Sequence, residues 1–374
     1  MDLSAEQRKE EILGEYESKK DTYSSLGNSM ISLIKALILK ESIAIHTMNF
    51  RVKTLKSLTT KIDEKDKYES LSDITDVLGV RIVTYYANDV DLIEGVIKKE
   101  FLVDEENTVD KRKKDSPDRF GYMSLHYIVS INKDREQLVE YELFKGIRFE
   151  IQIRTILQHT WAEIEHDLGY KSKDSVPEHV RRKFSILSGC LELIDSQFVE
   201  ISQIIKEYDE TTKSEISSSA ISSIGVDAIS MKNYVLTSSQ LEDLYRRYVD
   251  YTVEQSNRSE HELYLRMVDS TKKDEDVNYS NISRFLNLLG VNDINGVNDI
   301  ISEMSSDDKI IASIYTASHS VRPASGGSGD LYIKYLFFIF VIYGYVIKNG
   351  GYDNAISGTS QEKVINSFKR FYVS

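Results

Sequence analysis

Side chains able to bind phosphate or a divalent cation gather in five short segments of the sequence. In chain order, the segments are Arg51-Val52-Lys53, Asp76 to Arg81, Phe120 to His126, Phe149 to Thr155, and His159 to Lys171. Two carboxylates can hold Mg²⁺, and cations can neutralise a triphosphate. An aromatic ring can stack on a base, and a carboxylate can accept the proton of a ribose hydroxyl. Together the segments favour phosphoryl chemistry on a nucleotide.

Three apolar runs predict strands that would position these groups. Val77 to Tyr85 is rich in β-branched residues, and Tyr122 to Ile131 forms a second run. Phe149 to Thr155 alternates polar and apolar residues, so Glu150 and Gln152 would share one face of a strand. The same period would place Tyr122, Ser124 and His126 together on one face of their strand. The candidate residues would therefore meet on a sheet.

Helical spacing surrounds these strands. Apolar residues recur at intervals of three and four from Ser4 to about Thr60, so Arg51 and Lys53 are expected at a helix end or in the loop after it. Asp89 to Phe101 predicts a second helix, and a third should begin near Thr155.

A hairpin is predicted just ahead of that third helix. Glu140 to Phe144 would pair with Ile147 to Arg154 around a turn at Lys145-Gly146.

A long helix is predicted to follow Ser175-Val176-Pro177-Glu178, which combines a capping serine with an early proline and glutamate. Its apolar residues alternate spacings of four and three, as in a heptad seam. The seam consists of Val180, Phe184, Leu187, Leu191, Ile194, Phe198, Ile201, Ile205 and Tyr208. The 180–208 helix would either pack on its own domain or pair with another chain as a homo-oligomer.

The chain is expected to contain two domains. Residues 1–208 would form the domain with the five segments, 209–232 a linker that includes Ser217-Ser218-Ser219, and 233–374 a mainly helical C-terminal domain. The most hydrophobic stretch, Tyr335 to Ile347, is 13 residues long. It is too short for the roughly 20 residues that span a bilayer, so a buried helix is predicted and no membrane association.

Composition excludes several classes of protein. The net charge of −13 argues against a general nucleic-acid-binding surface, although it does not exclude one basic cleft. The single cysteine, Cys190, excludes a disulfide framework and a multi-cysteine zinc site. The polar, acidic first residues do not resemble a signal peptide. A cytoplasmic protein is expected.

The order of the motifs resembles the synthetase domain of the RelA/SpoT alarmone family. The motifs are RxK at Arg51, DxxGxR at Asp76, GYxSxH at Gly121, EIQIRT at Glu150 and HxWAxIEHxLxYK at His159. The resemblance covers roughly residues 45 to 200 and is closest to the stand-alone small alarmone synthetases. It implies an α/β (α+β) fold, a mixed central sheet flanked by helices with a nucleotidyltransferase-like synthetase core.

The resemblance also implies a role for each matching residue. Arg51 and Lys53 would hold the ATP phosphates, and Arg81 would stack on adenine. Asp76 and Glu150 would bind Mg²⁺, with Glu150 also activating the 3′-hydroxyl of the acceptor. Tyr122 would stack on the guanine of GDP or GTP, with His126 and Gln152 lining the same acceptor pocket. The implied reaction moves pyrophosphate from ATP to that hydroxyl and releases AMP.

Two positions depart from the pattern of the family. Asp118 and Met123 stand where members that use GDP or GTP carry a lysine and an arginine or similar polar residue. A toxic relative that pyrophosphorylates the 3′ end of tRNA is therefore an alternative, with the C-terminal region as its control element. A third hypothesis is a catalytically inactive nucleotide-binding scaffold.

Overall fold

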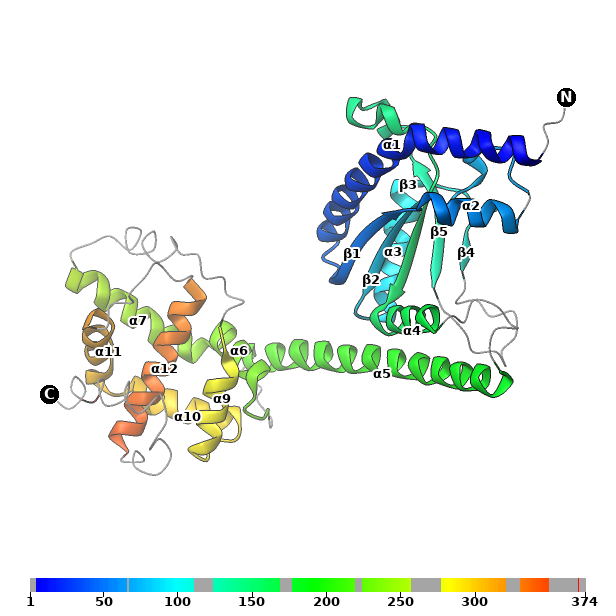
Figure 1. Cartoon of the computed structure of the whole chain (residues 1–374). Helices are drawn as coiled ribbons and strands as arrows, with labels where there is room; N and C mark the ends of the chain where they lie inside the picture. The colour runs from blue at the N-terminus through cyan, green and yellow to red at the C-terminus, as the bar shows by residue number, and fades with distance from the viewer. Residues whose placement is uncertain are drawn as a thin grey trace. The chain divides into compact units, whose positions relative to one another are not determined.

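The computed structural model describes residues 5–65, 67–110, 124–168, 177–218, 224–256, 277–320, 330–349 and 369. The chain divides into two units, Met1–Ser202 and Gln203–Ser374 (Figure 1). Each unit has its own cluster of buried apolar side chains.

A six-stranded mixed sheet is the centre of the first unit. Its strands are β1 (Ile45–Val52), β2 (Leu78–Thr84), β3 (Phe101–Val103), β4 (Val109–Asp110), β5 (Leu125–Ile131) and β6 (Phe149–Thr155). They lie in the order β1-β2-β6-β5-β3, and β4 also pairs with β5. β2 and β6 are parallel, and the other pairs are antiparallel. The predicted mixed α/β fold is confirmed.

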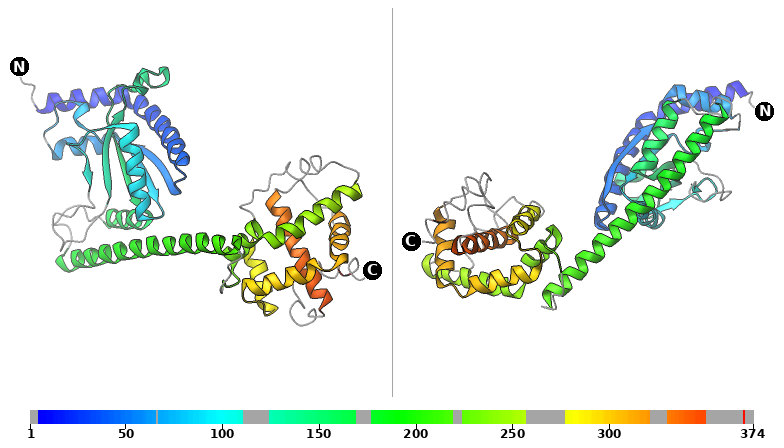
Figure 2. Two further views of the ribbon diagram at one scale, coloured as in Figure 1. Left: turned by 180° about the vertical axis from the view of Figure 1, so that it is seen from behind. Right: turned by 90° about the horizontal axis from the view of Figure 1, so that it is seen from below.

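Four helices accompany the sheet: α1 (Ala5–Lys40), α2 (Leu55–Glu64), α3 (Ala87–Glu100) and α4 (Ile156–Asp167). The apolar residues of the central strands, such as Val80 and Ile151, share one buried cluster with Leu26 of α1 and Ile93 of α3. Figures 1 and 2 show the ribbons of α1 and α3 beside the sheet. Because side chains alternate along a strand, the intervening polar residues of β2 and β6 point to the opposite face.

Two predictions in this unit are wrong. Ile45–Val52 is a strand within the segment expected to be helical, so Arg51 is a strand residue and Lys53 follows the strand directly. The predicted hairpin is absent among the described residues, because Val139–Phe144 forms a 3₁₀ helix and β6 pairs with β2 and β5. The turn itself was correctly located, since Gly146 has a φ of 70°, a conformation that favours glycine. Tertiary pairing decided the partner of β6, and local spacing does not reveal it.

The long predicted helix is present as α5, Glu178–Ser217. It continues nine residues into the segment expected to be a linker, and α6 begins inside that segment at Ala228. The helices of the second unit are α6 (Ala228–Thr237), α7 (Ser239–Ser256), α9 (Tyr279–Leu288), α10 (Ile294–Ser305), α11 (Asp308–Ser320) and α12 (Asp330–Lys348). This unit is helical, as predicted.

Helix α12 lies in the core of the second unit, which confirms the buried helix predicted around Tyr335 to Ile347. Phe338, Val341 and Ile342 are fully buried, and the Phe338 ring centroid lies 5.8 Å from that of Tyr234 on α6. Within the described part of the chain, no helix is both long and apolar enough to cross a membrane.

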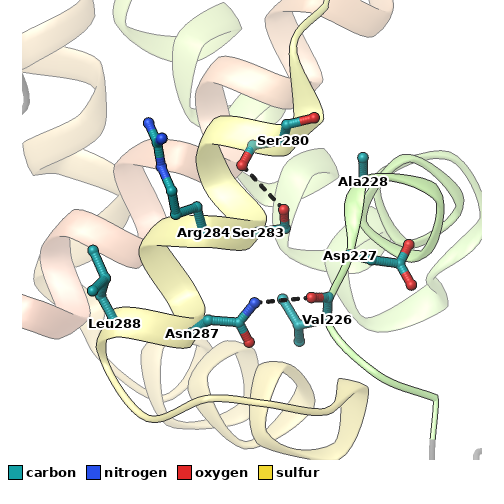
Figure 3. A pocket seen from close by; sticks show the side chains of 8 residues that line it. All are labelled: Val226, Asp227, Ala228, Ser280, Ser283, Arg284, Asn287 and Leu288. Atoms are coloured by element: carbon teal, nitrogen blue, oxygen red, sulfur yellow. Dashed lines mark hydrogen bonds between the residues drawn. The ribbon is translucent and has the colours of Figure 1, made fainter.

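Figure 3 shows where the start of α6 meets α9 beside a shallow cavity of about 420 Å³. The Asn287 side chain donates a hydrogen bond of 3.0 Å to the Val226 carbonyl. Asp227 caps α6 by accepting from the backbone N–H groups of Ile229 and Ser230. The Asn287 hydrogen bond therefore links α9 to the residue before the cap of α6.

Candidate active site

Strand pairing places the predicted site residues in two adjacent rows on one face of the sheet. In the first row, Arg51 lies opposite Gly79, which lies opposite Glu150. The second row, in order across four strands, is Asn49, Arg81, Gln152 and His126. Gly79 has no side chain, so the space between Arg51 and Glu150 stays open. The missed strand β1 is thus what brings Arg51 to the site.

Asp76 lies in the turn before β2 and binds two lysines. Its Oδ2 is 3.1 Å from Nζ of Lys53, and its Oδ1 is 2.7 Å from Nζ of Lys61. Burial raises the pKa of Asp76, but the hydrogen bond from Lys61 and the charge of Lys53 outweigh burial and lower the pKa overall. Asp76 is therefore ionised at neutral pH.

Lys61 was missed in the sequence. It stands in the last turn of α2, which begins at Leu55 after the capping side chain of Thr54. A helix starting so soon after Lys53 returns Lys61 to the same carboxylate. The eight-residue spacing between the two lysines, with a capping threonine between them, is the signal that could have identified it.

Glu150 is held by two neighbours on the same sheet face. Nδ1 of His126 lies 2.6 Å from its Oε1, and Gln152 donates to Oε2 at 2.8 Å. Burial raises the pKa of Glu150 and the nearby charge of Asp76 raises it further, but the hydrogen bond and charge of His126 lower it more. Glu150 is therefore also ionised, with only 14% of its side chain exposed.

A cavity of about 210 Å³ lies beside these groups. It is lined by Asn49, Arg51, Gly79, Val80, Arg81, Gln152 and Glu163. Glu163, a second residue that the sequence did not single out, binds Nη1 of Arg81 at 2.9 Å and Nη2 of the buried Arg154 at 3.4 Å. Burial and the charges of Arg154 and Arg81 lower the pKa of the neighbouring His159, so that ring stays neutral.

The local sequence explains why Glu163 reaches this cavity. Thr155 ends β6 and caps α4, and its side chain accepts from the Gln158 backbone while Gln158 binds back to the Thr155 N–H. This reciprocal cap starts the helix directly at the strand end. Glu163 then lies two turns into α4, beside β2 and β6.

The two ionised carboxylates fit a magnesium ion. Mg²⁺ in nucleotide sites is bound by one or two carboxylates together with substrate phosphates and water. Asp76 and Glu150 are close enough for the charge of one to shift the pKa of the other. No cluster of three or more acidic, histidine or cysteine side chains that could hold a metal occurs in the described ranges. Asp76 and Glu150 therefore suit a Mg²⁺ ion whose remaining ligands come from the substrate phosphates and water.

The structure brings most of the predicted site residues together. Those on the polar sheet face or directly beside it are Arg51, Lys53, Asp76, Arg81, His126, Glu150 and Gln152. Tyr122, Asp118 and Met123 lie outside the described residues. The individual roles of all these residues remain predictions.

This fold and site define a mixed α/β protein whose sheet carries two ionised carboxylates beside a cation-lined cavity. Residues 50–175 match the family model described as the region found in RelA / SpoT proteins. The chain is 30% identical over 162 residues to GTP pyrophosphokinase YwaC of Bacillus subtilis, covering 42% of this chain and 72% of that protein. It belongs to the RelA/SpoT family.

Two further proteins are similar to part of this chain. GTP pyrophosphokinase YjbM of Bacillus subtilis is 29% identical over 160 residues, covering 42% of this chain and 72% of that protein. The crystal structure of small alarmone synthetase 1 from Bacillus subtilis is 27% identical in sequence, with a TM-score of 0.43. The match covers 52% of this chain and 98% of the synthetase chain. Both matches cover about half of this chain or less.

Proposed function

We propose that this chain is a Mg²⁺-dependent pyrophosphokinase that transfers pyrophosphate from ATP to the ribose 3′-hydroxyl of GDP or GTP in the cytoplasm. The observation that carries the proposal is the pair of ionised carboxylates, Asp76 and Glu150, beside a cavity lined by Arg51 and Arg81. The names of the two Bacillus relatives support the same reaction.

The donor ATP is assigned to the cation-lined side of the site. Arg51 and Arg81 lie on adjacent strands and line one cavity, so their guanidinium planes can bind phosphate or stack on a base. Lys53 and Lys61 both form ion pairs with Asp76. A Mg²⁺ ion bound to that carboxylate would also bind the triphosphate, close to the two lysines. These four cations would offset the charge of ATP.

The acceptor is assigned to the side of Glu150 and His126. Ionised Glu150 accepts the proton of the 3′-hydroxyl of the acceptor. As the proton leaves, the 3′-oxygen attacks the β-phosphorus of ATP. A bond forms between that oxygen and the β-phosphorus, the bond from the β-phosphorus to the oxygen shared with the α-phosphate breaks, and AMP leaves. Mg²⁺, held by Asp76 and Glu150, would neutralise charge on the phosphates. Gln152 and His126 fix the orientation of Glu150.

A second candidate acceptor is the 3′ end of tRNA. It is favoured by Asp118, an acid at the position where the family resemblance implies a lysine in members that use GDP or GTP. An acid in the acceptor pocket would repel the 5′-phosphates of a free guanosine nucleotide, whereas the terminal adenosine of tRNA lacks such a di- or triphosphate.

One labelling experiment separates these acceptors. The purified full chain is incubated with Mg²⁺ and ATP labelled on the γ-phosphate, in parallel with GDP, GTP or tRNA. Label on GDP or GTP is expected, with AMP released in equal amount. Label on tRNA alone establishes the second candidate. If neither wild type nor the Glu150→Gln variant labels GDP, GTP or tRNA, both candidate acceptors are contradicted. The inactive scaffold is then the hypothesis that is left.

A further inference from the structure

A buried carboxylate on α5 has no part in the proposed reaction as described above. Asp195 is 3% exposed, and its Oδ2 accepts a hydrogen bond of 2.8 Å from the Thr155 hydroxyl. Its other oxygen, Oδ1, is buried and has no hydrogen-bond partner among the described residues. In the ranges that the structure describes, the Thr155 hydroxyl is the single polar partner of Asp195.

Asp195 occupies a position on α5 where an apolar residue is expected. Four residues at spacings of four, three and four share one face of the helix: Phe184, Ser188, Leu191 and Asp195. This face packs on the first unit, since the Phe184 ring lies edge-on to Trp161 of α4 with centroids 6.3 Å apart, and Ser188 is buried (Figure 1). An apolar side chain would suit such a face at least as well as an acid.

The charge of Asp195 is stabilised less than the charges of the two site carboxylates. Burial raises the pKa of Asp195, and the hydrogen bond from Thr155 offsets burial only in part. The pKa values of Asp76 and Glu150 are instead lowered by the residues around them. Keeping an acid buried without a cation is unfavourable for stability, so its presence indicates a constraint other than packing.

Thr155, the partner of Asp195, joins a strand and a helix of the candidate active site. It ends β6, which carries Glu150, and it caps α4, which carries Glu163. The hydroxyl that donates to Asp195 also accepts from the Gln158 backbone N–H at 3.2 Å. A hydroxyl has one hydrogen to donate, so its donation to Asp195 leaves a lone pair directed at the first turn of α4. Asp195 therefore fixes the orientation of the group that starts this helix.

The start of α4 leads to the cation-lined cavity. Glu163 lies about two turns further along α4 and binds Nη1 of Arg81 at 2.9 Å, and both residues line the cavity of about 210 Å³. Loss of a capping interaction loosens the first turn of a helix. A loosened α4 would move the carboxylate that holds Arg81.

We infer that Asp195 is a positioning residue for ATP. It holds the Thr155 hydroxyl, which fixes the start of α4 and, through Glu163, the guanidinium of Arg81 at the cavity. The inference rests on the proposed function, because it takes this cavity as the binding site of ATP. Asp195 itself touches neither substrate nor the reacting atoms.

Steady-state kinetics of the full chain with varied ATP tests this role. Asp195→Ala should raise the KM for ATP about two- to fivefold and leave kcat within about twofold, because it weakens the hold on Arg81 and not the chemical step. Asp195→Asn keeps an acceptor oxygen for the Thr155 hydroxyl and should restore the wild-type KM. A role in stability alone would lower kcat through a smaller folded fraction and leave the KM unchanged. That result, or an Asp195→Asn variant as impaired as Asp195→Ala, overturns the inference.

Two further variants separate this hydrogen bond from a general loosening of α5. Phe184→Leu weakens the packing of α5 on Trp161 and leaves Asp195 in place, so the KM for ATP should stay at the wild-type value. The double variant Asp195→Ala/Glu163→Gln should have the KM of Glu163→Gln alone, because the first change acts through the second residue. A rise in Phe184→Leu equal to that in Asp195→Ala, or multiplied effects in the double variant, overturns the inference.

The single tryptophan of the sequence gives a readout that needs no reaction. Trp161 is 8% exposed on α4, so its fluorescence reports the surroundings of that helix. Asp195→Ala should shift the emission maximum to longer wavelength, and Asp195→Asn should not. Calorimetric titration with ATP and Mg²⁺, without an acceptor, should give a Kd raised by the same factor as the KM.

These binding measurements separate failure of the inference from failure of the proposed function. If wild type binds ATP but transfers no pyrophosphate, the proposed function fails, and a raised Kd in Asp195→Ala still supports the positioning role. If wild type transfers pyrophosphate and Asp195→Ala leaves both the Trp161 emission and the Kd for ATP unchanged, the inference alone is overturned.

Discussion

The two units of this chain use their charged residues differently. In the first unit, the partly buried acids Asp76 and Glu150 lie on or beside one sheet face, and each is bound by neighbouring polar side chains. In the described part of the second unit, ion pairs join helices, as Lys334 does with Glu242 at 2.6 Å. There the aromatic side chains of α6, α7 and α12 supply the core.

This difference indicates which unit can carry the chemistry. Taking ionised groups out of water is unfavourable unless each is paired, so a cluster of them marks a functional site. The first unit maintains such a cluster around an open cavity. The second unit, where it is described, has an interior of aromatic and aliphatic side chains.

The sharpest test of the comparison changes one glutamate in each unit. Glu150→Gln should lower pyrophosphate transfer by about 10²- to 10⁴-fold, because the amide cannot accept the proton of the hydroxyl. Glu242→Gln should leave the rate within about twofold, since Glu242 binds Lys334 and lies in the second unit. Rates are measured with saturating ATP, and circular dichroism checks the folding of both variants. An equal loss in the two variants would contradict the division of roles.

The separate cores give a second test. Phe338→Ala removes a fully buried ring from the second unit and should destabilise that unit by about 3–5 kcal/mol. Urea unfolding followed by circular dichroism should show an earlier first transition, while transfer activity persists to the wild-type midpoint of the first unit. Leu288→Ala, at a position 61% exposed on α9, is the control and should change stability little. Loss of activity together with the first transition would show that the two units do not unfold independently.

The sequence predicted some elements of the first unit correctly and missed others. The alternation in Phe149–Thr155 correctly placed Glu150 and Gln152 on one strand face, and the helix predicted to start near Thr155 begins at Ile156. Strand β1 was missed because it carries mixed side chains, such as His46 and Asn49, and its stability comes from pairing with β2. Local patterns do not contain that information.

The missed site residues have the same explanation. Lys61 and Glu163 are charged residues on helices, where most such side chains are simply solvated. Their partners, Asp76 and Arg81, lie 15 and 82 positions away along the chain. Only the fold, which brings α2 beside Asp76 and α4 beside β2, shows that these charges meet. The spacing of residues along the sequence therefore could not identify Lys61 and Glu163, because their contacts join elements that are distant in the chain.

Glu163 offers a smaller test within the first unit. Glu163→Gln weakens the contact that holds Arg81 at the cavity, so the KM for ATP should rise about two- to fivefold with little change in kcat. The effect is modest because the Glu163 side chain is 55% exposed. Asp63→Asn, which breaks an exposed pair with Lys9, is the matched control and should leave the KM for ATP unchanged. A fall in kcat with unchanged KM would place Glu163 in the chemical step instead.

The smallest effect concerns pH, and it tests why Glu150 is ionised. Its pKa lies below the ordinary value of 4.5, so the charged form is fully present above that pH and is lost only as the pH falls through the lowered pKa. His126 is the largest influence that lowers this pKa, while burial opposes it. His126→Ala should therefore move the acid limb of the transfer rate to higher pH.

The direction of this shift distinguishes two roles for His126. If the ring acted only by shaping the pocket, its loss would lower the rate equally at all pH values and leave the acid limb in place. His159→Ala is the control, because His159 contacts Glu163 and not Glu150. If His159→Ala shifts the acid limb as far as His126→Ala does, the combined charges of the site set the ionisation of Glu150, and the contact with His126 is not specific. An unshifted limb in His126→Ala would mean that Gln152 and the backbone of β6 keep Glu150 ionised without the ring.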